Sequence, residues 1–231
     1  SKAEPVYKEN MLYYNHLTRK EQFLYDALVR AISSYQEYTE EIRYVFTSQE
    51  FNNVVQFIIS DNPDYFYVNY DHIESYVSET HTKVKIAYYI SKEETERMKA
   101  ELESVIAPIV EQVSLLQDDF DKELFIHDYL VENCTYSEAE DPNNYLNNTI
   151  YGALVQKKTL CDGYALAFKL LMNRSGLFCS TVSGFVKDEL PHRWNIVYID
   201  DQFYHVDVTW NDADMEHSKN MIFHGYFNLS R

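Results

Sequence analysis

The sequence has few residues of the kinds that interrupt regular structure or cross-link a chain. Among 231 residues there are 5 glycines, 5 prolines and 3 cysteines, whereas 45% of the residues are hydrophobic and 16% are aromatic. So few breakers among so many apolar residues exclude a disordered chain and predict a compact fold. Three widely spaced cysteines fit neither a disulfide framework nor a paired-cysteine metal site, which leaves a reactive thiol to be considered.

Positive charge and long apolar runs are also scarce. Twenty Lys and Arg residues against 37 Asp and Glu residues give a formal net charge of −17, and both halves of the chain are acidic. Such a chain repels phosphate backbones, so we expect no nucleic-acid partner. The longest apolar stretch, near residues 54–59, is far shorter than the ~20 residues of a membrane-spanning helix, so we expect no membrane span. The chain starts with Ser1. An extracellular or cell-surface location follows if a leader has been removed, and a cytoplasmic one otherwise.

The N-terminal half carries the start signals of helices. Three Ser/Thr-x-x-Glu capping boxes each precede apolar residues spaced three to four apart. The boxes begin at Thr18, Thr47 and Ser91. Between residues 65 and 90 an enrichment in Tyr, Val, Ile and Thr predicts two or three short strands. We therefore expect a mostly helical N-terminal region over residues 1–115 and a second domain over residues 116–231.

One cysteine lies where a helix is expected to begin. Residues 159–172 start at a polar turn and continue with helical periodicity, and Cys161 falls in the first turn. Unpaired backbone N–H groups and the helix dipole favour a thiolate at this position, so Cys161 is a candidate nucleophile. Because most free cysteines are small buried hydrophobic residues, a purely structural role stays open on this evidence alone.

Two strand-like runs lie further along the chain, at residues 192–199 and 202–210. Two aspartates separate them, which predicts a two-residue hairpin turn. In the register that this turn sets, His192 and Asp207 are diagonal neighbours on one face of the hairpin, within side-chain reach. A structural histidine paired with a structural carboxylate would look the same in the sequence.

The three residues together predict a catalytic triad. A carboxylate bonded to an imidazole fixes its tautomer, and that imidazole can deprotonate a cysteine and later protonate a leaving group. The triad would consist of Cys161, His192 and Asp207. His205 is a rival imidazole on the same face, but it lies only two residues from Asp207 on one strand, so we assign it a structural role.

Several segments around these residues resemble a known family. They are Asn148 to Leu154, Leu160-Cys161-Asp162-Gly163-Tyr164-Ala165, Val182-Ser183-Gly184, His192-x-Trp194-Asn195 and Tyr204-His205-Val206-Asp207-Val208-Thr209-Trp210. Together they resemble the bacterial transglutaminase-like superfamily, in its transglutaminase/protease-like, cytokinesis-associated branch. The resemblance covers about residues 118–231. Two departures from the family pattern, Arg193 and Asn211-Asp212, lie beside the triad positions.

The resemblance implies an α+β fold with a papain-like, transglutaminase-like core. In this core a nucleophile-bearing helix packs on an antiparallel sheet, and here a mostly helical N-terminal region would be added. Cys161 would be the nucleophile, His192 the base and Asp207 its orienting carboxylate. The superfamily contains transglutaminases, cysteine peptidases, amidases and inactive members, so the resemblance alone does not select a reaction.

These observations predict cysteine-dependent acyl transfer on peptide or protein amides, of protease or transglutaminase type. The alternative is a catalytically idle module that binds peptide or cell-surface ligands. We expect no metal, because the eight histidines lack the close spacing typical of metal ligands, and no organic cofactor. The candidate substrate-binding residues are Trp194, Trp210, Gln156 and Tyr164. The backbone N–H of Cys161 is the expected oxyanion donor, with Gln156 as a second candidate.

Overall fold

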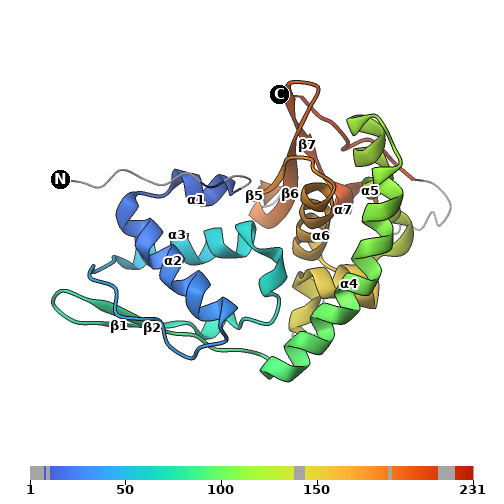
Figure 1. Ribbon diagram of the computed structural model, residues 1–231. Helices are drawn as coiled ribbons and strands as arrows, with labels where there is room; N and C mark the ends of the chain where they lie inside the picture. Colours follow the sequence, from blue (N-terminus) through green and yellow to red (C-terminus); the bar gives the residue numbers. More distant parts are fainter. Residues whose placement is uncertain (1–7, 9–10, 138–143, 187–188, 213–221, 231) are drawn as a thin grey trace. The chain divides into compact units, whose positions relative to one another are not determined.

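Figure 1 shows the computed structural model, which describes residues 8, 11–137, 144–186, 189–212 and 222–230. The chain divides into two compact units, residues 1–97 and 98–231. The division falls within helix α4 (Lys92–Ser114). The boundary expected from the sequence lies at the other end of the same helix, and that assignment of domains stays a prediction.

The first unit is mostly helical and carries one small hairpin. Its elements are α1 (Leu12–His16), α2 (Arg19–Ser33), α3 (Ser48–Asp61), the 3-10 turns η1 (Pro63–Tyr65) and η2 (Tyr70–His72), and the antiparallel strands β1 (Glu74–Val77) and β2 (Thr82–Lys85). The capping boxes predicted at Thr18 and Thr47 are both formed, at the starts of α2 and α3. The apolar residues of α2 and α3 then face one another in a buried core.

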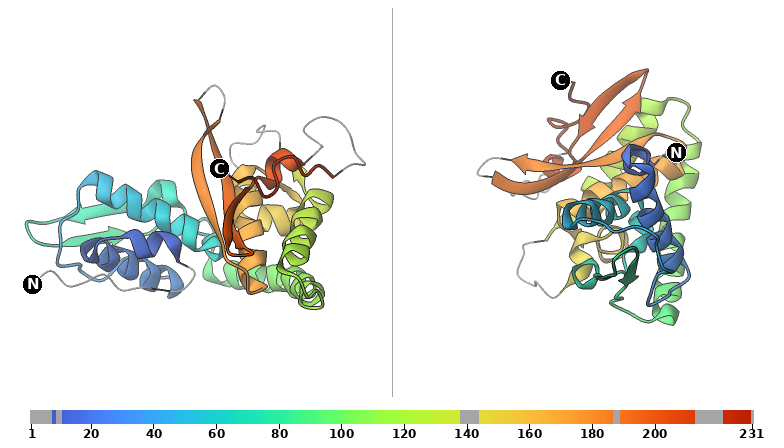
Figure 2. Two further views of the ribbon diagram at one scale, coloured as in Figure 1. Left: turned by 90° about the horizontal axis from the view of Figure 1, so that it is seen from above. Right: turned by 90° about the vertical axis from the view of Figure 1, so that its left-hand side faces the viewer.

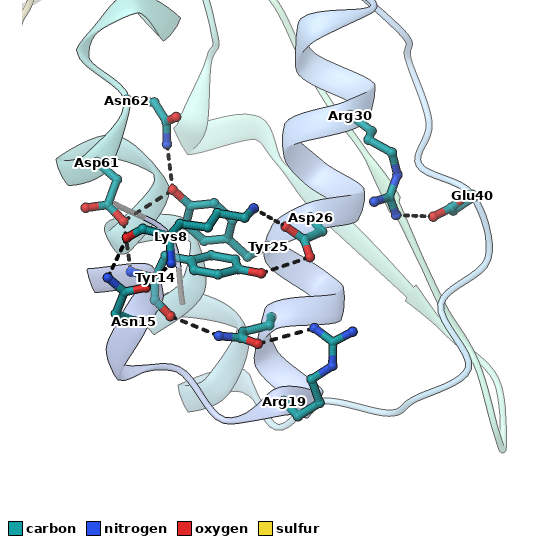
Figure 3. Close-up of polar contacts among 11 residues, drawn as sticks. Lys8, Tyr14, Asn15, Arg19, Tyr25, Asp26, Arg30, Glu40, Asp61 and Asn62 are labelled. Carbon is teal, nitrogen blue, oxygen red and sulfur yellow. Dashed lines mark hydrogen bonds and ion pairs between the residues drawn. The ribbon is translucent and has the colours of Figure 1, made fainter. Parts of the chain in front are cut away.

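A buried carboxylate joins the three helices of this unit (Figure 3). Asp61, at the end of α3, accepts hydrogen bonds from the backbone N–H of Tyr14 at 2.9 Å and from the hydroxyl of Tyr25 at 3.3 Å. Lys8 forms an ion pair with Asp26 of α2 at 2.7 Å. Because the unpaired N–H groups at the start of α1 have no partner within that helix, Asp61 supplies one from outside it.

The second unit is a helix-and-sheet core. Its main elements are α5 (Asp119–Asn133), α6 (Cys161–Arg174), β5 (Cys179–Val186), β6 (Leu190–Ile199), β7 (Gln202–Val206) and the short helix α7 (Val208–Asn211). The strands form an antiparallel sheet in the order β5-β6-β7. Helix α6 packs against this sheet and against α5, so it lies between the two (Figures 1 and 2).

Shorter elements lead into α6. They are β3 (Thr135–Tyr136), the 3-10 turn η3 (Tyr145–Asn148), the π-turn η4 (Gly152–Gln156) and β4 (Lys158–Thr159), with β3 and β4 paired in parallel. Helix α6 is buried on nearly all sides, as expected for an element enclosed between a sheet and a helix. The α+β class predicted from the sequence is confirmed, with the helix that carries Cys161 packed on an antiparallel sheet.

The hairpin register matches the prediction, but the second strand is shorter than predicted. Ile199 pairs with Gln202 and Asn195 with Val206, and both turn aspartates have positive φ, 49° and 60°, as a two-residue turn of this hand requires. Strand β7 ends at Val206 rather than continuing to residue 210. The extension predicted there is wrong, because the Asp207 side chain caps a new helix instead.

None of the helices in the described part of the chain combines the length and apolar character that crossing a bilayer requires.

Candidate functional site

Cys161 is the first residue of α6, as predicted. The turn before it is fixed by Asn147, whose carbonyl accepts both the backbone N–H of Leu160 and the hydroxyl of Thr159 at 2.7 Å. Gly163 packs so closely against this turn that no larger residue fits. A Cβ on this residue would lie 1.8 Å from the Thr159 Oγ1. These contacts hold the first turn of α6 against the preceding strand, so the position of Cys161 is defined by its neighbours.

Exposure distinguishes the three thiols. Cys134 and Cys179 are buried, with 4% and 1% of their surface exposed, whereas Cys161 is only partly buried. Burial raises the pKa of Cys134 to about 11 and the pKa of Cys179 further still. Both buried thiols are therefore protonated at neutral pH and inert. Cys161 is the one cysteine of the chain that reagents and substrates can reach.

His192 and Asp207 form a close pair beside Cys161. The Nε2 of His192 lies 2.6 Å from the Oδ2 of Asp207, and the Cys161 side chain is a further electrostatic neighbour of the imidazole. Since Nε2 is engaged by Asp207, the other ring nitrogen, Nδ1, is the one left for Cys161. The structure thus places the three residues of the predicted triad near one another, with His192 bonded to Asp207 and electrostatically coupled to Cys161.

The surroundings of His192 stabilise its charged form. Burial lowers the pKa of His192, but the hydrogen bond to Asp207, the neighbouring Cys161 side chain and the Asp207 charge outweigh burial and raise the pKa to about 9. At neutral pH the ring is therefore an imidazolium held between a carboxylate and a sulfur atom.

Each oxygen of the Asp207 carboxylate has its own hydrogen-bond partner. Its Oδ1 accepts the backbone N–H of Trp210 at 3.2 Å and so caps α7, while its Oδ2 bonds His192. The capping bond explains why the strand ends here. It also limits rotation of the carboxylate, because both oxygens already have partners.

Trp194 and Trp210 both lie close to the ring of His192. Their ring centroids are 6.0 and 5.5 Å from the centroid of the imidazole. Trp194 donates its indole N–H to the Nδ1 of His205 at 3.0 Å. This bond engages the Nδ1 of His205, in keeping with the structural role assigned to that residue. A cavity of about 160 Å³ adjoins His192 and Asp207. Its lining consists of His192, Trp194, His205, Asp207, Trp210, Tyr226 and Leu229.

One family model matches part of the second unit. The model of the transglutaminase-like superfamily matches residues 108–208, a span that contains Cys161, His192 and Asp207. The match covers less than half of the 231-residue chain. The superfamily predicted from the sequence is confirmed, and the bacterial, cytokinesis-associated branch stays a prediction.

Two kinds of relatives are similar to parts of the chain. Over 68 residues the sequence is 37% identical to kyphoscoliosis peptidase from Homo sapiens and from Mus musculus, a match that spans 25% of this chain and 10% of each relative. A solved transglutaminase (TGase) has 16% identity and a TM-score of 0.45, covering 80% of this chain and 53% of that one. The periplasmic domain of TgpA from Pseudomonas aeruginosa has 13% identity and a TM-score of 0.41, covering 58% and 54%.

Tyr164 is not exposed on the surface of the second unit. Its side chain is fully buried in α6, and its hydroxyl donates to Asp212 next to Cys134. The prediction that Tyr164 contacts substrate is therefore wrong, because α6 turns this position towards the interior. Gln156 is exposed at the end of the π-turn. No hydrogen bond among the described residues joins Gln156 to the triad, and its role stays a prediction.

Arg193, which departs from the family pattern, joins the sheet to the nucleophile helix. Its Nε lies 3.3 Å from the Oδ1 of Asp162 and 3.2 Å from the Oγ of Ser183. Because Asp162 follows Cys161, this buried guanidinium connects β5 and β6 to the first turn of α6. The alternation along β6, which places Arg193 on the face opposite His192, is the sequence signal that could have predicted this contact.

A cluster of possible metal ligands lies on α5 and the C-terminal segment. Asp128 Oδ1 is 2.8 Å from both His127 Nδ1 and His224 Nε2. The amide nitrogen of Asn211 donates to His127 Nε2 at 3.0 Å, so the proton of this ring is on Nδ1 and is donated to Asp128. Burial lowers the pKa of His127 and keeps the ring neutral. Hydrogen bonds thus occupy both ring nitrogens of His127, and neither is free to bind a metal ion.

Proposed function

We propose that this chain catalyses cysteine-dependent acyl transfer on peptide or protein amides. The observation that carries the proposal is the His192–Asp207 pair, with 2.6 Å between His192 Nε2 and Asp207 Oδ2, next to the partly buried Cys161 at the start of α6. A protonated imidazole between a sulfur and a carboxylate is the arrangement that a thiolate nucleophile and its acid-base partner need.

In the proposed reaction the Cys161 sulfur attacks the carbonyl carbon of the amide. The resulting tetrahedral oxyanion is stabilised by backbone N–H groups at the start of α6, where the first turn has unpaired donors. His192 gives its Nδ1 proton to the leaving amine, and the C–N bond breaks to leave a thioester. Water or a second amine then attacks the thioester, His192 takes a proton from it, and the thiolate is released.

The choice between water and amine decides between hydrolysis and transamidation. The indole rings of Trp194 and Trp210 pack near His192, which is 9% exposed, and reduce the access of water to the imidazole. They are the substrate-contacting residues of the proposal, with Gln156 as an additional candidate. Every step of the scheme uses groups of the chain and of the two substrates.

The test is turnover of a panel of peptide and protein amides, with products identified by mass as free acids or amine adducts. We expect Cys161→Ala to lose turnover by a factor on the order of 10⁴ or more, because no other group replaces the nucleophile. Cys134→Ala is the matched control, since this thiol is buried and protonated. Equal turnover by wild type and Cys161→Ala would contradict the proposal and favour a module that binds amides without converting them.

A further inference from the structure

Three hydrogen bonds form a closed ring around the backbone of Asp207. The N–H of Asp207 donates to the carbonyl of Tyr226 at 2.9 Å, and the N–H of Tyr226 donates to the Oδ1 of Asn211 at 2.8 Å. The N–H of Asn211 returns to the carbonyl of Asp207 at 3.2 Å. Both polar groups of the Asp207 backbone are therefore held by partners that are also bonded to each other.

The Asn211 side chain is itself fixed from outside the ring. It is fully buried, and because its Oδ1 must face the N–H of Tyr226, its Nδ2 faces His127 of α5 at 3.0 Å. His127 is also fully buried and its Nδ1 bonds Asp128. The ring around Asp207 is thus anchored to a helix that belongs to the core of the second unit.

These bonds leave the Asp207 carboxylate little freedom. Its backbone N–H and carbonyl are both hydrogen-bonded. Its Oδ1 accepts from the N–H of Trp210, and its Oδ2 bonds His192. A catalytic carboxylate must keep its position closely, since a displacement of about 1 Å can lower a rate about 100-fold. Asn211 contributes two of the three bonds in the ring, whereas it does not itself contact His192 or Cys161 in the described structure.

We propose that Asn211 is a positioning residue, which holds Asp207 so that its carboxylate stays on the Nε2 of His192. The inference rests on the proposed function, because it assigns a role within the same triad. Asn211 acts through Asp207 and is therefore distinct from the catalytic residues. A residue that only stabilised the fold would affect melting without affecting the state of His192.

The test compares Asn211→Ala, which breaks the ring and its anchor, with Asn211→Asp, which keeps the oxygen that accepts from Tyr226. The readouts are the titration of His192 by NMR and the pH dependence of Cys161 alkylation, neither of which needs turnover. The groups facing His192 are Asp207, Cys161 and the two indole rings. Ile109→Ala in α4 is the control for general loss of stability.

We expect Asn211→Ala to lower the midpoint of the His192 titration by about one pH unit or more, a tenfold loss of proton affinity, because Asp207 is no longer held on the ring. Asn211→Asp should keep the midpoint at or above that of wild type. Ile109→Ala should lower the melting temperature and leave the midpoint unchanged. If Asn211→Ala does not fold, Asn211→Ser removes the same bond with a smaller change in volume and carries the same expectation.

A lower melting temperature with an unchanged His192 titration in Asn211→Ala would overturn the inference and leave Asn211 as a structural residue. A midpoint lowered equally in Asn211→Asp would also overturn it, because the ring is retained there. Failure of the proposed function gives a different result, namely no turnover by wild type while the His192 titration responds to Asn211→Ala as expected.

Discussion

Asp207→Asn is expected to lower turnover by a factor on the order of 10³–10⁴ and to leave the fold and substrate affinity nearly unchanged. Asparagine caps helices as well as aspartate does, so the bond to the Trp210 N–H and the helix α7 are retained. The amide N–H group, however, would face His192 Nε2 and force that nitrogen to accept. The ring proton then lies on Nδ1, and His192 can no longer take the proton from Cys161.

The matched control is Asp200→Asn, because Asp200 is an exposed turn residue and asparagine also tolerates its positive φ. Melting temperature, affinity for a substrate analogue and turnover are measured for both variants. A loss of stability on the order of 1–3 kcal/mol in Asp207→Asn, with unchanged turnover, would show that the His192–Asp207 pair is structural and would contradict the triad.

Glu123→Gln is expected to raise the free energy of unfolding by up to roughly 3 kcal/mol at pH 8 and to have little effect at pH 4. Glu123 is fully buried in α5, its Oε1 has no hydrogen-bond partner, and burial raises its pKa to about 7 despite a bond from Asn228. The folded protein therefore binds a proton that the unfolded chain releases above about pH 4.5. The free energy of unfolding therefore falls as the pH rises from about 4.5 to about 7. Glutamine stays neutral over this range, so the variant does not show this loss.

Chemical denaturation of both proteins from pH 4 to pH 8 measures this effect. Glu132→Gln is the matched control on the same helix, because Glu132 is exposed and stays in water in both states. If wild type and Glu123→Gln had parallel pH profiles, the buried carboxyl would not be the group that takes up the proton.

The sequence was sufficient to predict the local geometry of the hairpin. Two aspartates between apolar runs specify a two-residue turn, and the turn length alone sets the pairing of β6 with β7. The approach of His192 to Asp207 followed from that register. The capping boxes of α2 and α3 were predictable for the same reason, since each depends on residues only three positions apart.

Contacts between segments distant in sequence could not be predicted in this way. The bond from Asn211 to His127 joins residues 84 positions apart, and no periodicity within either segment indicates it. The burial of Tyr164 depends on how α6 is enclosed between the sheet and α5. The end of β7 was missed because Val208 and Thr209 are β-branched and favour strands, whereas the side-chain cap of Asp207 starts a helix.

The central claim is that Cys161 is the activated nucleophile of this chain, and thiol labelling tests it most directly. The folded protein is treated at pH 7 with a mild thiol-directed amide-mimic probe, and the modified peptides are mapped by mass spectrometry. We predict modification of Cys161 first, with Cys134 and Cys179 modified only after unfolding, because both are buried and protonated. Faster modification of Cys134 or Cys179 in the folded protein would contradict the account.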